Sequence, residues 1–211
     1  MRFHFFLVIL IFFINENALP QSKVTLPVSF EAPIETEIKK FFNISRGQLE
    51  DLRAGNVISE GDVTTPKDHE QQMMLFVAGV HPRNCTRVMR KLSLYENYNQ
   101  YMDFVKESKY DEASQKISFI LDHTLLPFPM SLTFKLARIT KEGHYPFTFD
   151  NGFLKDLKGT VVVKEVGKFC LLGLKTDWRG PESKIPNMVF ETFVQTVGKL
   201  GLEHLIRVSI F

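Results

Sequence analysis

A chain of 211 residues has room for one domain, or for one domain with a small extension. An apolar fraction of 44% and a charged fraction of 24% allow a buried core and exclude a disordered chain. The net charge is only +2, so we expect no nucleic-acid partner, and we interpret the densest basic run, residues 83–91, as a solvated helix face. Twenty Phe against one Trp predict an interior with few hydrogen-bonding groups.

The chain begins like a secretory signal peptide. Arg2 provides a basic start, and residues 5–14 are an unbroken apolar run of ten residues, too short to cross a bilayer core of about 30 Å as a helix. Ala18 and Ser22 are the candidate ends of the leader. We therefore expect residues 1–22 to be a signal peptide and the protein to be exported, to the periplasm in a bacterium and otherwise by secretion. An uncleaved leader would instead leave an N-terminal membrane anchor.

The two cysteines, Cys85 and Cys170, leave two alternatives open. An exported protein folds in an oxidising compartment, where the two could pair. Both lie among apolar residues, one on a predicted helix face and one in a predicted strand, which favours two separately buried thiols. Apolar surroundings raise the pKa of a thiol, so we do not expect either to be a reactive nucleophile. Triplets at Asn43 and Asn84 match the glycosylation sequon of eukaryotic secreted proteins.

Residues 23–63 are predicted to form an N-terminal extension with short helices. Ser45 with Gln48 three residues later is a capping box, which predicts a helix over residues 45–54. A strand is expected directly after it, over residues 57–63.

Residues 64–211 are predicted to form the main domain. A strand over residues 71–80 leads into an amphipathic helix and then into a short helix or turn over residues 94–102. The apolar stripe of the amphipathic helix recurs at helical spacing: Cys85, Val88, Met89 and Leu92. A strand over residues 104–110 is followed by four or five more with turn residues between them: 116–126, 131–140, 144–154, 158–166 and 168–179. Their close spacing predicts an antiparallel sheet that buries one face.

The last predicted element is a long helix over residues 186–207. Its apolar face is expected to hold residues that recur at helical spacing: Phe190, Phe193, Val197, Leu200, Gly201 and His204. Gly198 and Gly201 each cost about 1 kcal/mol relative to Ala inside a helix, which indicates a close approach to the backbone there. We expect this helix to lie across a curved sheet, above an apolar hollow.

This order of strand, two helices, antiparallel strands and long C-terminal helix resembles the helix-grip fold of the START/polyketide-cyclase (SRPBCC) superfamily. Residues 88–102 are similar to the V-W-x-x-L-x-D-Y-x-x-Y-P-x-F-M segment of that family, with Met89, Leu94 and Asn99 in place of its Trp, Asp and Pro. Further similar segments are the L-P-F-P turn at 126–129, the G-x-L strand with its following x-G at 152–159, and the L-x-x-G-x-V lead-in at 49–57. The resemblance covers about residues 45–207, and it implies an α+β fold with a deep cavity for lipids, quinones, sterols or polyketides.

The sequence and this resemblance together predict an exported, non-catalytic protein that binds or transports a hydrophobic small molecule. The expected cavity residues lie on the strand faces and on the final helix: Phe119, Leu121, His123, Leu132, Phe134, Leu136, Tyr145, Phe147, Phe149, Trp178, Phe193 and Val197. His123 has an ordinary core or surface position as its alternative, and Trp178 is interpreted as a packing or pocket-mouth residue rather than a stacking platform. Arg138 is expected at the rim of the sheet, because an isolated buried charge is too costly.

Two other functions stay open. One is a cyclase or hydratase acting in the same cavity, with His123 and Tyr145 as its candidate groups, and the other is a structural or interaction module whose sheet is solidly packed. The common catalytic motifs are absent and the six His are far apart, so we expect no catalytic residue, no metal and no cofactor. The expected partner is a hydrophobic small molecule, with transient membrane contact as an option; the sequence indicates no oligomeric state.

Overall fold

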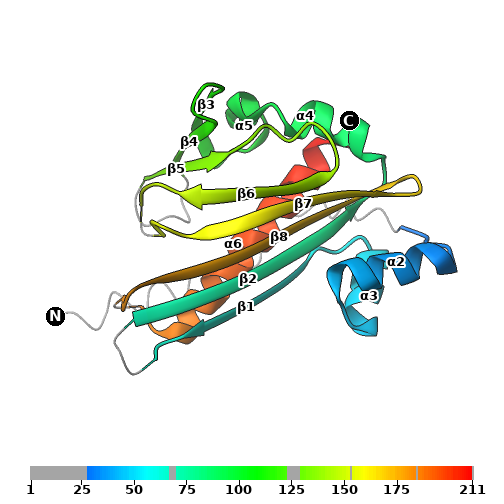
Figure 1. Ribbon diagram of the computed structural model, residues 1–211, viewed down its shortest axis with the longest axis horizontal. Helices are drawn as coiled ribbons and strands as arrows, with labels where there is room; N and C mark the ends of the chain where they lie inside the picture. The colour runs from blue at the N-terminus through cyan, green and yellow to red at the C-terminus, as the bar shows by residue number, and fades with distance from the viewer. Residues whose placement is uncertain (1–27, 67–69, 123–128, 153, 184, 211) are drawn as a thin grey trace.

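The computed structural model describes residues 28–66, 70–122, 129–152, 154–183 and 185–210. Within these residues eight strands form one open antiparallel sheet, in the order β1-β2-β8-β7-β6-β5-β4-β3 (Figure 1). The strands are β1 (Ile58–Thr64), β2 (Glu70–His81), β3 (Val105–Asp111), β4 (Lys116–Leu121), β5 (Met130–Leu136), β6 (Gly143–Phe149), β7 (Lys158–Val166) and β8 (Phe169–Pro181). The predicted α+β class and the antiparallel run of strands are confirmed.

Short helices precede the sheet and follow β2, and one long helix ends the described chain. They are α2 (Ala32–Phe42), α3 (Arg46–Arg53), α4 (Cys85–Leu92), the 3-10 helix η1 (Tyr95–Asn97), α5 (Tyr98–Tyr101) and α6 (Asn187–Val208). The capping box of α3 is present, with the Gln48 N–H donating to Ser45 Oγ (3.3 Å) and the Ser45 N–H donating to Gln48 Oε1 (2.7 Å). None of the described helices has both the length and the apolar composition needed to cross a membrane.

Helices cover both faces of the sheet near the end of β2 and the start of β8. The long helix α6 lies on one face, and α2 and α3 lie against the other (Figure 1). The prediction that the sheet buries one face is wrong here, because alternate residues of β2 and β8 enter two different apolar clusters. The cluster under α2 and α3 includes Ile38, Phe42, Leu49, Leu52, Ala78, Val80 and Leu171.

The N-terminal part of the described chain packs against the core. Val28 and Phe30, which precede α2, are buried in the same cluster as α2 and α3. The Val28 N–H donates to Arg53 O (2.8 Å) and so joins this segment to the end of α3. β1, within the predicted extension, pairs with β2 along its whole length. The boundary between extension and main domain stays a prediction, as does the signal peptide, which lies outside the described residues.

The face that α6 turns to the sheet agrees with the prediction at Phe190 and departs from it further along the helix. Phe190 and Val194 are buried, whereas Val197 and Leu200 are 51% and 42% exposed. The expected close approach is present at Gly198, where a Cβ would lie 2.8 Å from Val77 Cγ2. It is absent at Gly201, where a Cβ would meet no atom within 4 Å. The periodic pattern therefore predicted the helix correctly but placed its contact face about one residue out of register.

Hydrogen bonds attach the first half of α6 to the β1–β2 edge of the sheet. Asn187 Oδ1 accepts hydrogen bonds from Gln71 Nε2 (2.8 Å) and from Thr65 Oγ1 (3.0 Å). The backbone carbonyl of Gln195 accepts a hydrogen bond from Ser59 Oγ (3.0 Å), and the side-chain Nε2 of Gln195 donates one to Gly61 O (3.2 Å). These bonds satisfy polar groups that packing has taken out of water, and they fix the position of the helix on the sheet.

A disulfide joins α4 to the sheet. Cys85 and Cys170 are bonded through their Sγ atoms, and both residues are buried. The favoured interpretation of two separate thiols is therefore wrong: the helical stripe that buries Cys85 faces the same core as the strand face that carries Cys170. The Cys85 N–H also donates to Glu165 Oε2 (2.9 Å), so two bonds hold the start of α4 against β7 and β8.

One buried histidine lies beside this disulfide. His81 is fully buried at the end of β2, opposite Cys170 in the register of β2 and β8. Its Nδ1 accepts from the Arg83 N–H (3.0 Å), and its Nε2 has no hydrogen-bond partner among the described residues. Burial lowers the pKa of His81 from 6.5 to about 4, because the charged imidazolium would lose its hydration.

Removing the disulfide should lower stability strongly. The bond closes a loop with a sequence separation of 85 residues, for which the loss of chain entropy in the unfolded state corresponds to about 4.6 kcal/mol. We expect the Cys85→Ser/Cys170→Ser variant to unfold in urea with a free energy lower by about that amount, and the reduced native sequence to behave like the variant. A loss below about 1 kcal/mol would contradict the pairing.

The burial of His81 should make stability depend on pH. A basic group whose pKa is lower in the folded state contributes stability that is fully present above the unfolded pKa and is lost as the pH falls from 6.5 towards 4. We expect a decrease of up to about 3 kcal/mol across this window. The variant His81→Asn keeps an acceptor for the Arg83 N–H and should lose this dependence, whereas His144→Asn, at an exposed position, should keep it. Equal pH dependence of both variants would be the contrary result.

Candidate functional site

An apolar cavity of about 370 Å³ lies between the concave face of the sheet, α4, α5 and α6. The strands provide its floor, the second half of α6 provides its roof, and the residues from α4 to the start of β3 close one end. The roof is thin at Gly201, where the absent side chain leaves open space, and Val197 beside it is both exposed and part of the lining. The cavity therefore reaches the surface along this side of α6.

The structure brings together eight of the twelve residues predicted to line a cavity. They are Phe119, Leu121, Leu132, Phe134, Leu136, Phe147, Phe149 and Val197. Phe119, Phe134 and Phe149 form a continuous aromatic wall, with ring centroids 5.6 Å apart in the first pair and 5.1 Å apart in the second. Strand alternation alone identified this wall, because residues two apart on a strand share one face. That these residues contact a ligand stays a prediction.

The other four predicted residues do not line the cavity or are not described. Trp178 is buried in the core, where its ring packs edge-on against Phe190 (centroids 5.9 Å apart) and its Nε1 donates to Lys155 O (3.0 Å). Tyr145 shares the face of Phe147, but its hydroxyl donates to Lys141 O (2.8 Å) beyond the lining. Phe193 packs against the core from the side of α6. His123 lies outside the described residues.

Much of the lining comes from segments that the sequence interpretation did not assign to it. The end wall consists of Met89, Leu92, Tyr95, Tyr98, Met102, Phe104 and Val105, and the floor also includes Val77, Ile117, Ile139, Val161, Val163, Leu172, Gly173 and Leu174. The roof adds Gly198, Gly201, Leu202 and Leu205. The amphipathic stripe of α4 was the available signal for Met89 and Leu92. No periodic signal distinguishes Tyr95 and Tyr98, because η1 and α5 are each about one turn long.

The two tyrosine hydroxyls in the lining are already hydrogen-bonded within the protein. Tyr95 donates to Ala137 O (3.2 Å) and accepts from the Ile139 N–H (3.0 Å), and Tyr98 donates to Leu92 O (2.7 Å). Burial raises the pKa of both hydroxyls, so both stay neutral. Among the described lining residues there is no carboxylate, His, Lys or Arg, and the cavity thus offers an apolar surface with no group free for proton transfer.

Arg138 lies close to the Tyr95 ring of this end wall but is not part of the cavity lining. Arg138 donates from Nε to Glu112 Oε1 (2.7 Å) and from Nη1 to Glu96 Oε2 (3.1 Å), and its guanidinium lies 4.4 Å from the centre of the Tyr110 ring. It is paired at the rim of the sheet, as predicted, and is not one of the residues that line the cavity. Within the described part of the chain, no group of three or more His, Cys, Asp or Glu side chains is arranged to hold a metal ion.

Solved structures with the same architecture are found at low sequence identity. The Zhui aromatase/cyclase from Streptomyces sp. R1128 matches with a TM-score of 0.55 and 10% identity, over 65% of this chain and 93% of that one. An uncharacterized protein from Bacillus thuringiensis matches with a TM-score of 0.52 and 14% identity, over 65% and 99%. Ara h 8.0201 matches with a TM-score of 0.51 and 8% identity, over 66% and 98%. No protein-family model and no curated protein matches the sequence.

The chain has the helix-grip fold. The predicted resemblance to the START/polyketide-cyclase superfamily is confirmed at the level of fold. The matched region covers almost the whole of each of these three solved structures, whereas about a third of this chain lies outside it. In helix-grip terms, β2 is the first strand, α4 and α5 are the two short helices that follow it, and α6 is the helix that the sheet grips.

Replacing each of the two glycines of α6 by alanine should change the free energy of unfolding differently. At Gly201 the Cβ meets open space, so Gly201→Ala should raise the free energy of unfolding by about 1 kcal/mol through helix propensity alone. At Gly198 the Cβ would approach Val77 to 2.8 Å, so Gly198→Ala should gain nothing or lose about 1 kcal/mol. Urea unfolding of both variants measures the difference, and an equal gain at both positions would contradict the docking of α6.

Proposed function

We propose that this protein binds a hydrophobic small molecule in the cavity under α6 and performs no chemistry on it. The observation that carries this proposal is the apolar cavity of about 370 Å³, which lies in the usual range of about 300–1,000 Å³ for small-molecule sites. Burial of apolar ligand surface at about 25 cal/mol per Å² would supply the affinity. Lipids, quinones, sterols and polyketides are the ligand classes that the fold resemblance suggests.

The absence of proton-transfer groups from the described lining favours binding over catalysis. A cyclase or hydratase needs an acid and a base at the reacting atoms. Tyr95 and Tyr98 are neutral and already bonded to backbone groups, and the hydroxyl of Tyr145 is bonded outside the lining. A cavity of this size also argues against the solidly packed module.

The disulfide supports the proposal that the protein works outside the cytosol. Buried structural disulfides form and persist in oxidising compartments such as the periplasm or the extracellular space. The bond between Cys85 and Cys170 therefore agrees with export by the leader that residues 1–22 resemble. Binding and export together describe a carrier or a sensor of a hydrophobic molecule.

Native mass spectrometry is the first test of binding. The protein is purified without detergent, its mass is measured under native conditions, and an organic extract of the same sample is analysed. We expect an added mass that disappears on denaturation and reappears as an apolar compound in the extract. A protein that carries no such compound and takes up none from a mixture of lipids and quinones would contradict the proposal.

A variant that blocks the cavity should show whether an apolar dye binds there or elsewhere on the surface. Gly201→Phe adds an aromatic ring where the roof of the cavity is open, and it should weaken binding of the apolar dye Nile red by about tenfold or more. Leu200→Phe, at the neighbouring position, is exposed and outside the lining, and is the matched control. Fluorescence titration measures both dissociation constants. Equal values for the two variants would mean that the dye binds elsewhere.

A further inference from the structure

The apolar cavity reaches the surface beside α6 without offering a hydrogen bond to a ligand. Its opening lies at Gly201 and Val197. The hydroxyls of Tyr95 and Tyr98 are the side-chain oxygens of the described lining, which has no side-chain nitrogen, and both hydroxyls are already bonded to backbone atoms. Small-molecule sites usually add a few placed polar groups to an apolar lining, and these groups fix the orientation of the ligand. In this protein such a group has to stand at the opening.

His204 stands next to this opening on α6. Val197, Gly201 and His204 recur at helical spacing and form one stripe along the helix. A helical side chain covers the turn that precedes it, so the half-buried His204 side chain is directed towards the turn with the open space at Gly201. Its ring also meets the ring of Phe104 edge-on, with centroids 5.8 Å apart. Phe104 lines the cavity and His204 does not, so His204 lies where the cavity wall meets the surface.

The imidazole nitrogens of His204 are available to a ligand. Within the part of the chain that the structure describes, they form no hydrogen bond and no ion pair. An imidazole can donate a hydrogen bond from one nitrogen and accept one at the other. The nearby charged residues of α6, Lys199 and Glu203, are each two positions from Gly201, and residues two apart on a helix do not face each other. His204 therefore offers, beside the opening, the hydrogen-bonding group that the lining lacks.

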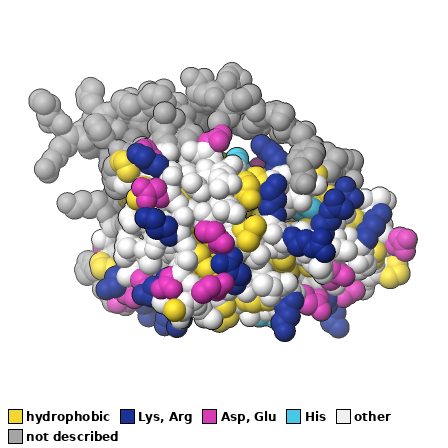
Figure 2. All heavy atoms as spheres, turned by 90° about the horizontal axis from the view of Figure 1, so that it is seen from above, with side chains coloured by type: hydrophobic (Ala, Val, Ile, Leu, Met, Phe, Trp, Pro, Cys, Tyr) yellow, Lys and Arg dark blue, Asp and Glu magenta, His cyan; other side chains and the backbone are white. Residues whose placement is uncertain are grey.

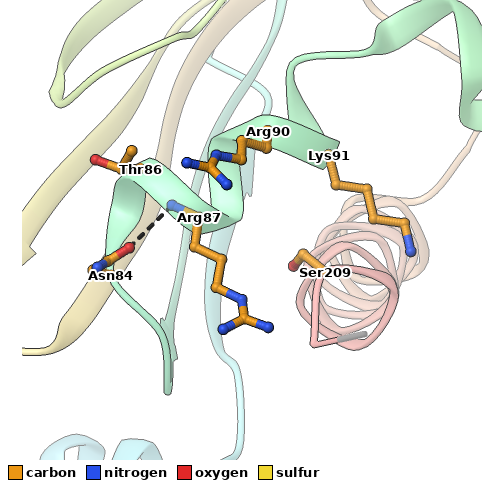
Figure 3. Close-up of a pocket in the computed structure, with 6 residues that line it drawn as sticks. All are labelled: Asn84, Thr86, Arg87, Arg90, Lys91 and Ser209. Carbon is orange, nitrogen blue, oxygen red and sulfur yellow. Dashed lines mark hydrogen bonds between the residues drawn. The ribbon is translucent and has the colours of Figure 1, made fainter.

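The other polar features of the surface do not belong to the cavity. A hollow of about 490 Å³ lies between α4 and the end of α6 (Figure 3), and none of its lining residues lines the cavity: Asn84, Thr86, Arg87, Arg90, Lys91 and Ser209. The face shown in Figure 2 carries both basic and acidic side chains, with hydrophobic side chains between them. Neither feature selects a charged group for a ligand in the cavity.

We infer that His204 binds the polar end of the ligand, and that this end is a neutral hydroxyl group. The inference rests on the proposed cavity function and adds the chemical class of the ligand, an apolar body with a hydroxyl at one end. A hydroxyl can both donate and accept, so it pairs with the imidazole whichever nitrogen faces it. An ionised end is disfavoured, because no charged side chain of the described lining could neutralise it. The aromatic wall of Phe119, Phe134 and Phe149 suits flat rings in the apolar body.

The experiment compares naphthalene with 2-naphthol, which differ by one hydroxyl, on the full-length, disulfide-bonded protein. Dissociation constants are measured by displacement of Nile red, and the readout is the ratio of the naphthalene constant to the 2-naphthol constant. His204→Phe keeps a ring against Phe104 but has no nitrogen, and His204→Gln keeps a donor and an acceptor. We expect the ratio to fall about fivefold in His204→Phe, with naphthalene binding unchanged, and to be largely kept in His204→Gln. Lys199→Gln, at an exposed position of the same helix, is the control and should keep the ratio.

Each other outcome overturns a defined part of the account. A ratio that is unchanged in His204→Phe, including the case in which both compounds lose affinity equally, overturns the role of His204 but leaves the cavity function intact. A ratio that falls equally in His204→Phe and His204→Gln, or equally in Lys199→Gln, also overturns it, because the effect would then not come from the imidazole nitrogens. Displacement of Nile red by neither compound from the native sequence overturns both the inference and the cavity function.

Discussion

A single helix cannot cover an eight-stranded sheet, and the hollow in this protein follows from that constraint. Eight strands at about 4.8 Å spacing are about 34 Å across, whereas a helix with its side chains is about 10–12 Å wide. The close contact at Gly198 and the hydrogen bonds of Asn187 and Gln195 fix α6 over β1 and β2. The concave face of the remaining strands is left to large apolar side chains, which line it without filling it.

The other elements make such a hollow stable. The disulfide and the bond to Glu165 hold α4 against β7 and β8, so the end wall of the cavity keeps its place without packing from inside. On the opposite face, α2 and α3 bury a second apolar cluster against β2, β7 and β8. This layer adds apolar burial that the cavity side cannot supply, because each empty cavity costs stability.

Elements with a strong period could be predicted from the sequence, and those whose place depends on distant contacts could not. Period-two alternation identified the aromatic wall of Phe119, Phe134 and Phe149, and the capping box identified α3. The contact face of α6 was misplaced because Val197 and Leu200 are apolar but exposed, and only the approach of Val77 to Gly198 decides the register. The disulfide joins residues 85 apart in sequence, and no local pattern carries that information. The end wall at Tyr95 and Tyr98 was missed because η1 and α5 are too short to show a period.

The central claim is that the space under α6 is empty of the protein's own side chains and is apolar. A crystal structure determined under xenon pressure tests it most directly, because xenon enters dry apolar cavities of this kind. The account predicts xenon density, or density of a retained ligand, between the rings of Phe119 and Phe134 and the backbone at Gly201. A structure in which α6 lies down on β4 to β6, with the space filled by Phe and Leu side chains and no xenon bound, would contradict it.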